Sequence, residues 1–250
     1  MTTLPATIAD GENGYNPFMS TGRRPAATNE PHDQPAYALA EAARYLKLPT
    51  ATLRAWTFGR QYPTAQGEGQ FRPLIRPASN RPPLLSFSNL IEAHVLRALR
   101  TEHGVSVKAV RDAVRFAERK LNVDRLLLSP ELRAEAGRIF LDRYGELINL
   151  SASGQLAMRQ VLNTHLKRVT WEDQSPIRLH PFVMGEAIAE MPIAIDPRIA
   201  FGRPTVVSRG VSTAAIVGRI DAGESVAAVA ADYALSQEEV KQAVLYERAA

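Results

Sequence analysis

The side chains best suited to chemistry in this sequence are threonines and arginines in its first half, and the chemistry they suit is the binding of nucleic acid. Guanidinium groups bind phosphate oxygens and can form two parallel hydrogen bonds with a guanine edge, while threonine can contact phosphate or a thymine methyl group. We take seven residues as candidate DNA contacts: Thr50, Thr52, Arg54, Arg60, Arg72, Arg76 and Arg81.

The distribution of charge agrees with this assignment. The chain has 250 residues and a formal net charge of +4, which alone says little. Residues 37–125, however, carry 15 Lys and Arg against 7 Asp and Glu, whereas the segments before and after them are each net −2. Clustered positive charge is typical of a protein that binds a polyanion, because neutralised phosphates release their condensed counterions. The alternative is a solvated arginine-rich surface.

Residues needed for catalysis or metal binding are missing or badly spaced. The chain has no cysteine, which excludes disulfides, a thiol nucleophile and cysteine-built metal sites. Its five histidines show no metal-ligand spacing, and neither a phosphate loop nor a nucleophile elbow occurs. We therefore expect no catalytic residues, no metal and no cofactor. No signal peptide and no membrane-length apolar run is visible either, so we expect a cytoplasmic protein without membrane contact.

Residues 50–54 need a helix that exposes them. Apolar residues recur at helical spacing from Leu39 to Leu46, and Pro49 then ends this helix. Thr50 can cap a second helix in which Leu53 and Trp56 face the core. Two short helices joined by three or four residues have the proportions of a helix-turn-helix. Arg54 then points outward to DNA; an ion pair within the domain is the alternative.

The later arginines need an extended segment. We expect two short strands, Phe71–Ile75 and Leu84–Phe87, joined by a loop that contains proline and asparagine. Arg72, Arg76 and Arg81 lie on or near this hairpin, where a wing would follow the sugar–phosphate backbone. Loose exposure to solvent is the alternative for these three side chains.

The order of these elements resembles that of the MerR family. Thr52-Leu53-Arg54, early in the second helix and followed by Trp56, is similar to the first helix-turn-helix of that family. Leu85-Ser-Phe-Ser-Asn-Leu90 and Gly104-Val-Ser106 follow in the family's order, with helices expected at 89–103 and 106–121. The resemblance covers 37–121 and implies a winged helix-turn-helix that binds twofold DNA sites as a homodimer. Family members dimerise through a longer helix than this one, so dimerisation here must use another surface.

The middle of the chain has a different texture. We expect strands at Gly137–Asp142 and Glu146–Leu150 around a Tyr144-Gly145 turn, and a helix at Gly154–Leu166. Strand-like segments follow at Val169–Trp171 and Ile177–Phe182. Such a mixed region could enclose a small-molecule pocket.

The end of the chain is helical. After a short strand at Thr205–Ser208, we expect three helices, at Thr213–Asp221, Ser225–Tyr233 and Ser236–Arg248, with a capping box formed by Ser236 and Glu239. The segment 213–248 carries three basic residues against six acidic ones, which disfavours phosphate contact and suits contact with protein.

The last 55 or so residues resemble a small bacterial domain of unknown function that occurs in VapB-type antitoxins. The resemblance rests on Asp196-Pro197, on Gly202-Arg203-Pro204 and on the Gly-Glu-Ser turn at 223–225; the family's Gly-Thr-Arg element reads Gly210-Val-Ser here. It implies that the chain neutralises a PIN-like ribonuclease toxin and represses their shared operon. We take Asp196, Gly202, Arg203 and Pro204 as candidate partner contacts. The alternatives are a plain tight turn for 202–204 and a turn cap for Asp196.

Together these features predict an α+β, mostly helical protein. The expected segments are a disordered tail (1–36), a MerR-like winged helix domain (37–121), a mixed α/β linker or dimerisation region (122–191) and a three-helix, helix-turn-helix-like domain (192–250). The expected function is that of an antitoxin and autorepressor. A stand-alone regulator that senses a small molecule is the main alternative, and an enzyme with an uncharacterised site is the remotest one.

Overall fold

A computed structural model describes most of the chain: residues 30–64, 67–100, 107–129, 132, 135–147, 151–173, 175–183 and 191–249. Most of the tail expected at 1–36 lies outside these residues, as do Gly104, Ser106 and the segment 148–150. The fold is mixed α and β and mostly helical, as predicted.

The helix-turn-helix consists of α1 (Leu39–Tyr45) and α2 (Thr50–Phe58). Leu46 and Lys47 form the turn between them, with Lys47 in the left-handed region at φ +52°. The expectation that Thr50 caps α2 is wrong. Pro49 occupies the capping position and Thr50 is the first helical residue, because the Pro49 carbonyl accepts from the amides of Thr52 and Leu53.

Two hairpins follow α2, instead of the single one expected. The first pairs β2 (Arg60–Thr64) with β3 (Gly67–Phe71), and the second pairs β4 (Ser79–Asn80) with β5 (Pro83–Leu85). β1 (Tyr37–Ala38) adds to the second, giving the order β1-β5-β4. The strand predicted at Phe71–Ile75 is wrong, because the backbone amides of Leu74 and Ile75 donate to the carbonyl of Trp56 and fold this segment onto α2.

The next helices are α3 (Phe87–Arg100) and α4 (Val107–Leu121), close to the expected bounds. The amide of Asn89 donates to the Ser86 hydroxyl at 3.2 Å, so Ser86 caps the first turn of α3. The main hydrophobic core includes residues from α1, α2, α3 and α4. Short 3-10 turns precede and follow these elements: η1 (Pro31–Asp33) and η2 (Leu126–Leu128).

The strands expected at Gly137–Asp142 and Glu146–Leu150 are wrong within the described residues. A helix, α5 (Glu135–Leu147), runs through the supposed Tyr144-Gly145 turn and packs against α4 and α6 (Ala152–Leu166). Phe140 and Tyr144, one helical turn apart, are both fully buried. The Gln155 side chain of α6 lies against α5 at Gly145. The glycine therefore allows close packing of the two helices and does not mark a turn.

The rest of the chain follows the prediction closely. β6 (Val169–Glu172) pairs with β7 (Ser175–Leu179), and a bridge from Leu179 to Ile195 leads into a small sheet. This sheet has the order β10-β9-β8. Its strands and the adjoining 3-10 turn are β8 (Ile193–Ala194), η4 (Ala200–Gly202), β9 (Thr205–Val206) and β10 (Val211–Ser212). Three helices close the chain around a second hydrophobic core: α7 (Thr213–Asp221), α8 (Val226–Asp232) and α9 (Gln237–Arg248). The predicted capping box of Ser236 and Glu239 is confirmed.

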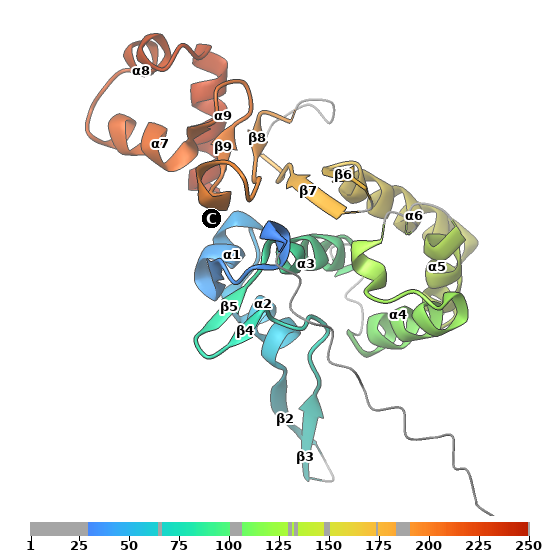
Figure 1. Ribbon diagram of the computed structural model, residues 1–250. Coiled ribbons are helices and arrows are strands. Elements are labelled where there is room, and N and C mark those ends of the chain that lie inside the picture. The colour runs from blue at the N-terminus through green and yellow to red at the C-terminus, as the bar shows by residue number, and fades with distance from the viewer. Residues whose placement is uncertain are drawn as a thin grey trace, which may run out of the picture.

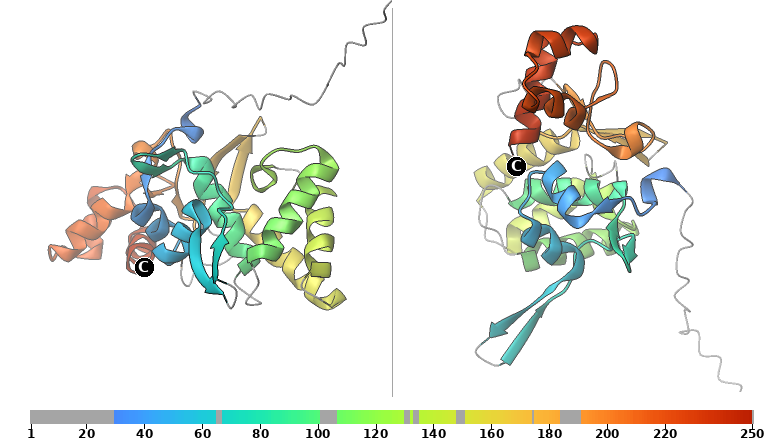
Figure 2. Two further views of the ribbon diagram at one scale, coloured as in Figure 1. Left: turned by 90° about the horizontal axis from the view of Figure 1, so that it is seen from below. Right: turned by 90° about the vertical axis from the view of Figure 1, so that its left-hand side faces the viewer.

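The β2–β3 hairpin and the helices α7–α9 project from opposite ends of the molecule (Figures 1 and 2). The C-terminal unit rests on α1 through the end of α9. There the Tyr246 hydroxyl donates to the Tyr45 carbonyl at 3.0 Å, and Glu247 Oε2 lies 2.6 Å from Arg44 Nη1. The Lys47 ammonium lies 4.1 Å above the centre of the Tyr246 ring. In the part of the chain that the structure describes, none of the helices has the length and apolar character needed to cross a bilayer.

Candidate nucleic-acid interface

Helix α2 is oriented as its sequence predicts. Leu53 and Trp56 are 0% and 2% exposed and belong to the main core. Thr50 and Arg54 are exposed, and Thr52 is half-buried. The helix therefore anchors one face in the core and presents the opposite face to solvent, as a recognition helix must.

Arg54 is available for an external ligand. Among the described residues, its guanidinium makes no ion pair and no hydrogen bond, while its backbone carbonyl accepts from the Thr57 hydroxyl at 3.3 Å. The alternative of an ion pair within the domain thus finds no partner in that part of the chain. A long cationic side chain on the exposed face of a short helix can reach phosphate or a base edge.

The base of the β2–β3 hairpin collects a second group of cations. Arg60 opposes Phe71 in the strand register, and Arg72 follows Phe71 directly. Arg111 of α4 holds this point: its guanidinium lies 4.8 Å from the centre of the Phe71 ring and donates a hydrogen bond to the Arg72 carbonyl. Burial, reinforced by the positive charges of Arg115 and Arg72, lowers the pKa of Arg111.

No local pattern in the sequence marks Arg111 as a functional residue. It occupies the polar side of an amphipathic helix 39 residues after Arg72, and only the folded chain brings the two together. Its contacts with the Phe71 ring and the Arg72 carbonyl connect the end of β3 to α4. Arg111 is therefore a positioning residue for the hairpin.

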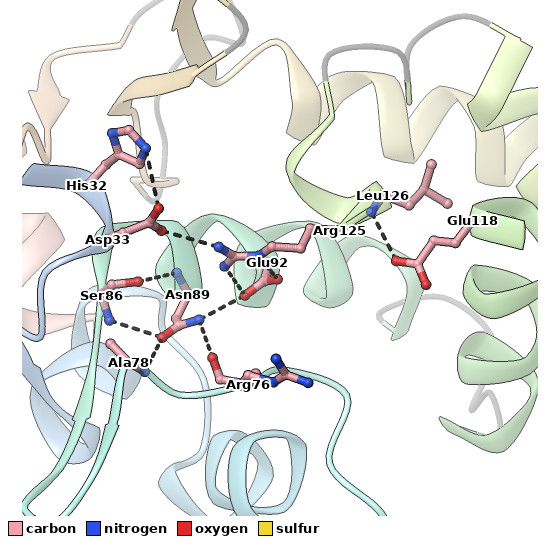
Figure 3. Close-up of polar contacts among 10 residues, drawn as sticks. All are labelled: His32, Asp33, Arg76, Ala78, Ser86, Asn89, Glu92, Glu118, Arg125 and Leu126. Atoms are coloured by element: carbon pink, nitrogen blue, oxygen red, sulfur yellow. Dashed lines mark hydrogen bonds and ion pairs between the residues drawn. The ribbon is translucent and has the colours of Figure 1, made fainter. Parts of the chain in front are cut away.

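Arg76 lies on a separate segment that Asn89 holds in place (Figure 3). The Asn89 side chain donates to the Arg76 carbonyl at 2.9 Å and accepts from the amides of Ala78 and Ser86 at 3.0 and 3.1 Å. The guanidinium of Arg76 points away from this network and is exposed. Arg81 is exposed in the β4–β5 turn. The structure thus groups Arg60 and Arg72 at one hairpin and places Arg76 and Arg81 on or beside the other.

The same network continues into a buried acidic group. Asn89 donates to Glu92 at 2.9 Å, and Arg125 bridges Glu92 and Asp33 at 3.2 Å from each (Figure 3). Burial raises the pKa of Glu92, and the positive charge of Arg125 opposes that shift. These groups connect η1, α3 and the segment after α4, and their role is to support the domain.

The candidate partner contacts in the C-terminal unit differ in accessibility. Asp196 is only 1% exposed and accepts hydrogen bonds from the Arg198 amide at 2.9 Å and from the Arg178 guanidinium at 3.2 Å. Although burial opposes it, bonds from Arg198 and Arg178 hold the pKa of Asp196 below its ordinary value. Asp196 therefore shapes the turn, which is one of the two alternatives that its sequence context leaves open.

Gly202 and Pro204 are buried, whereas Arg203 between them is exposed. Gly202 has φ +73°, and a β carbon there would overlap the Tyr37 hydroxyl, so only glycine fits against the N-terminal domain. Of the four candidates, Arg203 alone presents its side chain to solvent.

Most of the acidic groups in helices α7–α9 are neutralised within the chain. Arg219 pairs with both Glu224 and Asp232, Arg248 pairs with Asp221, and Glu247 pairs with Arg44. Only Arg44 comes from outside these helices, so pairing lowers by one charge the negative excess that in the sequence favours contact with a protein.

Comparison with known proteins agrees with the division seen in the structure. Residues 35–114 match a family model described as "Putative DNA-binding HTH domain", and residues 193–246 match one described as "Protein of unknown function (DUF433)". The first spans α1 to the middle of α4, and the second spans β8 to α9.

Two curated proteins of Mycobacterium tuberculosis are similar to almost the whole chain. "Putative antitoxin VapB45" is 30% identical over 233 residues, which are 85% of this chain and 93% of that protein. "Uncharacterized protein Rv2308" is 26% identical over 224 residues, 86% of this chain and 90% of that protein. A crystal structure of Rv2018 from the same organism superposes with a TM-score of 0.62 at 24% identity and covers 84% of this chain and 97% of its own. This likeness shows a shared fold.

Proposed function

The chain belongs to the same family as the protein named "Putative antitoxin VapB45", and from this premise we propose that it is an antitoxin that represses its own operon. Its toxin would be a PIN-like ribonuclease, as the resemblance of residues 192–250 to VapB-type antitoxins implies. One observation supports DNA binding most directly: a helix-turn-helix whose second helix exposes Arg54, which has no ionic partner among the described residues.

We propose a division of labour along the chain. The MerR-like winged domain, 37–121, binds operator DNA through Thr50, Thr52 and Arg54 on α2, with Arg60, Arg72, Arg76 and Arg81 along the two hairpins. The tail 1–36 precedes it, the region 122–191 supplies dimer contacts, and 192–250 binds the toxin with Arg203 at its surface. A twofold operator would match a homodimer of this kind.

Replacing Arg54 by alanine is expected to weaken operator binding. If its guanidinium contacts a base, the loss should be about 1–3 kcal/mol, or roughly 5- to 150-fold in Kd. The measurement is a gel-shift titration with a duplex from the chain's own promoter at fixed salt. Arg209→Ala, at an exposed position of the C-terminal unit, removes the same charge outside the proposed DNA and dimer contacts and serves as the matched control. Equal affinity of the Arg54 and Arg209 variants would contradict the assignment of Arg54 to the interface.

Association with the toxin is tested separately. We expect this chain to form a stable complex with the product of the adjacent gene when the two are expressed together and passed over a sizing column. Micromolar or tighter binding corresponds to about 8 kcal/mol or more. Failure of the two purified proteins to associate at micromolar concentration would remove the antitoxin function and leave DNA binding intact.

A further inference from the structure

The surface loop around η4 presents a large apolar side chain to solvent in a costly backbone conformation. Phe201 is 92% exposed, more than any other large hydrophobic residue among those described. Ala200, Phe201 and Gly202 have φ values of +48°, +56° and +73° in succession. Non-glycine residues rarely adopt this region, and such conformations persist where the surrounding structure enforces them.

Contacts on both sides of the loop enforce this conformation. On one side, Asp196 accepts from the Arg198 amide, and its carbonyl accepts from the Ile199 amide at 2.9 Å. On the other side, Gly202 lies against the Tyr37 hydroxyl of the N-terminal domain. The Gly202 amide donates to the Ile199 carbonyl at 2.9 Å and closes the turn. The loop therefore holds the Phe201 ring outward as a rigid projection.

The surroundings of Phe201 are apolar and positively charged. Ile199 and Val207 are also exposed. The Ile199 side chain lies beside Gly210, which belongs to the same turn as Val207. Arg203 is exposed and makes no ion pair with any described residue, while the only carboxylate inside the loop, Asp196, is buried and already bonded to two arginines. Phenylalanine flanked by arginine is the composition found at the energetic centre of protein interfaces.

We propose that Phe201 is the anchor by which this chain binds its toxin, with the ring in an apolar pocket of the toxin and Arg203 against an acidic rim of that pocket. This inference rests on the proposed antitoxin function and names the surface that carries it. A second copy of this chain is a poorer occupant, because a twofold contact centred on the loop would bring like charges together. Operator DNA is a poorer one too, because the C-terminal unit lies at the opposite end of the molecule from the β2–β3 hairpin (Figure 1).

The test compares Kd values for the toxin encoded by the adjacent gene, measured by calorimetry with purified full-length chains. Phe201→Ala should weaken binding by about 30-fold or more, as truncation of an interface anchor does. Arg203→Ala should make the Kd less dependent on salt concentration. Tyr62→Ala, which truncates an exposed aromatic side chain on β2, is the matched control and should change Kd less than about threefold. Thermal unfolding of each variant verifies that the fold is retained.

The outcomes separate the two proposals. If the wild-type chain fails to bind the toxin, both the antitoxin function and the role of Phe201 as an anchor are overturned. If the wild-type chain binds and Phe201→Ala binds within about threefold of it, the anchor alone is overturned. If Phe201→Ala loses self-association in sedimentation velocity without toxin, the loop forms a contact between copies of the chain instead. If Phe201→Ala binds the operator more weakly than the wild-type chain does, the loop contacts DNA. Either result would overturn the proposal.

Discussion

Replacing Gly59 by alanine is expected to displace the β2–β3 hairpin and to cost about 2–5 kcal/mol in the free energy of unfolding. Gly59 ends α2 with φ +75° and ψ −177°, a region that is essentially closed to residues with a β carbon. The added carbon would also overlap the backbone carbonyl of Phe71, which cannot move without shifting the strand that carries it. Urea unfolding measures the change in stability.

Gly59→Ala should also weaken operator binding, because it displaces the hairpin. Arg60 and Arg72 leave the domain at this point, so a displaced hairpin should lower operator affinity together with stability. Gly218→Ala is the matched control: Gly218 lies inside α7 with open space around its Cα, and the substitution should be neutral or stabilise the helix by about 0.5–1 kcal/mol. Normal stability and normal DNA binding of Gly59→Ala would mean that the hairpin has no fixed place in the domain.

Acidification should destabilise the protein through two buried histidines. Burial lowers the pKa of His94 far below its ordinary value and that of His165 to about 4. The centres of their rings lie 5.0 Å apart. His94 Nε2 lies 3.0 Å from the His165 carbonyl oxygen, and His165 Nδ1 lies 3.0 Å from the Val161 carbonyl oxygen. Above a pH of about 6.5, the ordinary pKa of histidine, both are neutral in the folded and unfolded states, and their contribution to stability is complete.

As the pH falls below about 6.5, the two histidines become protonated in the unfolded chain but stay neutral in the folded chain. Each histidine should then reduce stability by about 1.4 kcal/mol per pH unit, or roughly 2 kcal/mol between about pH 6.5 and pH 5. For His165 the loss should continue until its folded-state pKa of about 4 is reached. Urea unfolding at half-unit intervals of pH measures the slope, and the range above about pH 5 avoids most carboxylate titration.

Two conservative variants isolate the effect. His94→Gln can keep an amide donor at the Nε2 position, and His165→Asn can keep one at the Nδ1 position, while neither side chain titrates. Each variant should remove about one proton from the slope. If the double variant loses stability on acidification as steeply as the wild-type chain, the pH dependence has another origin.

The parts of the fold that the sequence predicts well are those in which burial leaves a pattern. Leu53 and Trp56 are spaced to face one side of α2, and the capping box of Ser236 and Glu239 marks the start of α9. The β2–β3 hairpin escapes prediction because it projects into solvent: its two strands have little apolar alternation, since neither has a core to face. Helix α5 resembles two strands in sequence because Tyr144-Gly145 has the composition of a turn, and only contact with α4 and α6 decides otherwise.

The candidate site is predictable to the same limited degree. The exposure of Arg54 follows from the helical period, but the support that Arg111 and Asn89 give to the hairpins depends on residues brought together from distant parts of the chain. The exposure of Phe201 cannot be foreseen, because its left-handed backbone is imposed by Tyr37 and Asp196 and leaves no local signal.

The junction between α9 and the helix-turn-helix joins the two ends of the molecule through specific side-chain contacts. The Glu247 carboxylate contacts both Arg44 of α1 and Thr213 of α7. The ammonium group of Lys47, in the turn that precedes α2, lies over the Tyr246 ring. If the affinities of two ligands, one at each end, both depend on this arrangement, each ligand must change the affinity of the other by the same factor, because such coupling is reciprocal. Under the proposed function, binding of a protein partner by the C-terminal unit would then change the affinity of the winged domain for the operator, and operator binding would change the affinity for that partner by the same factor.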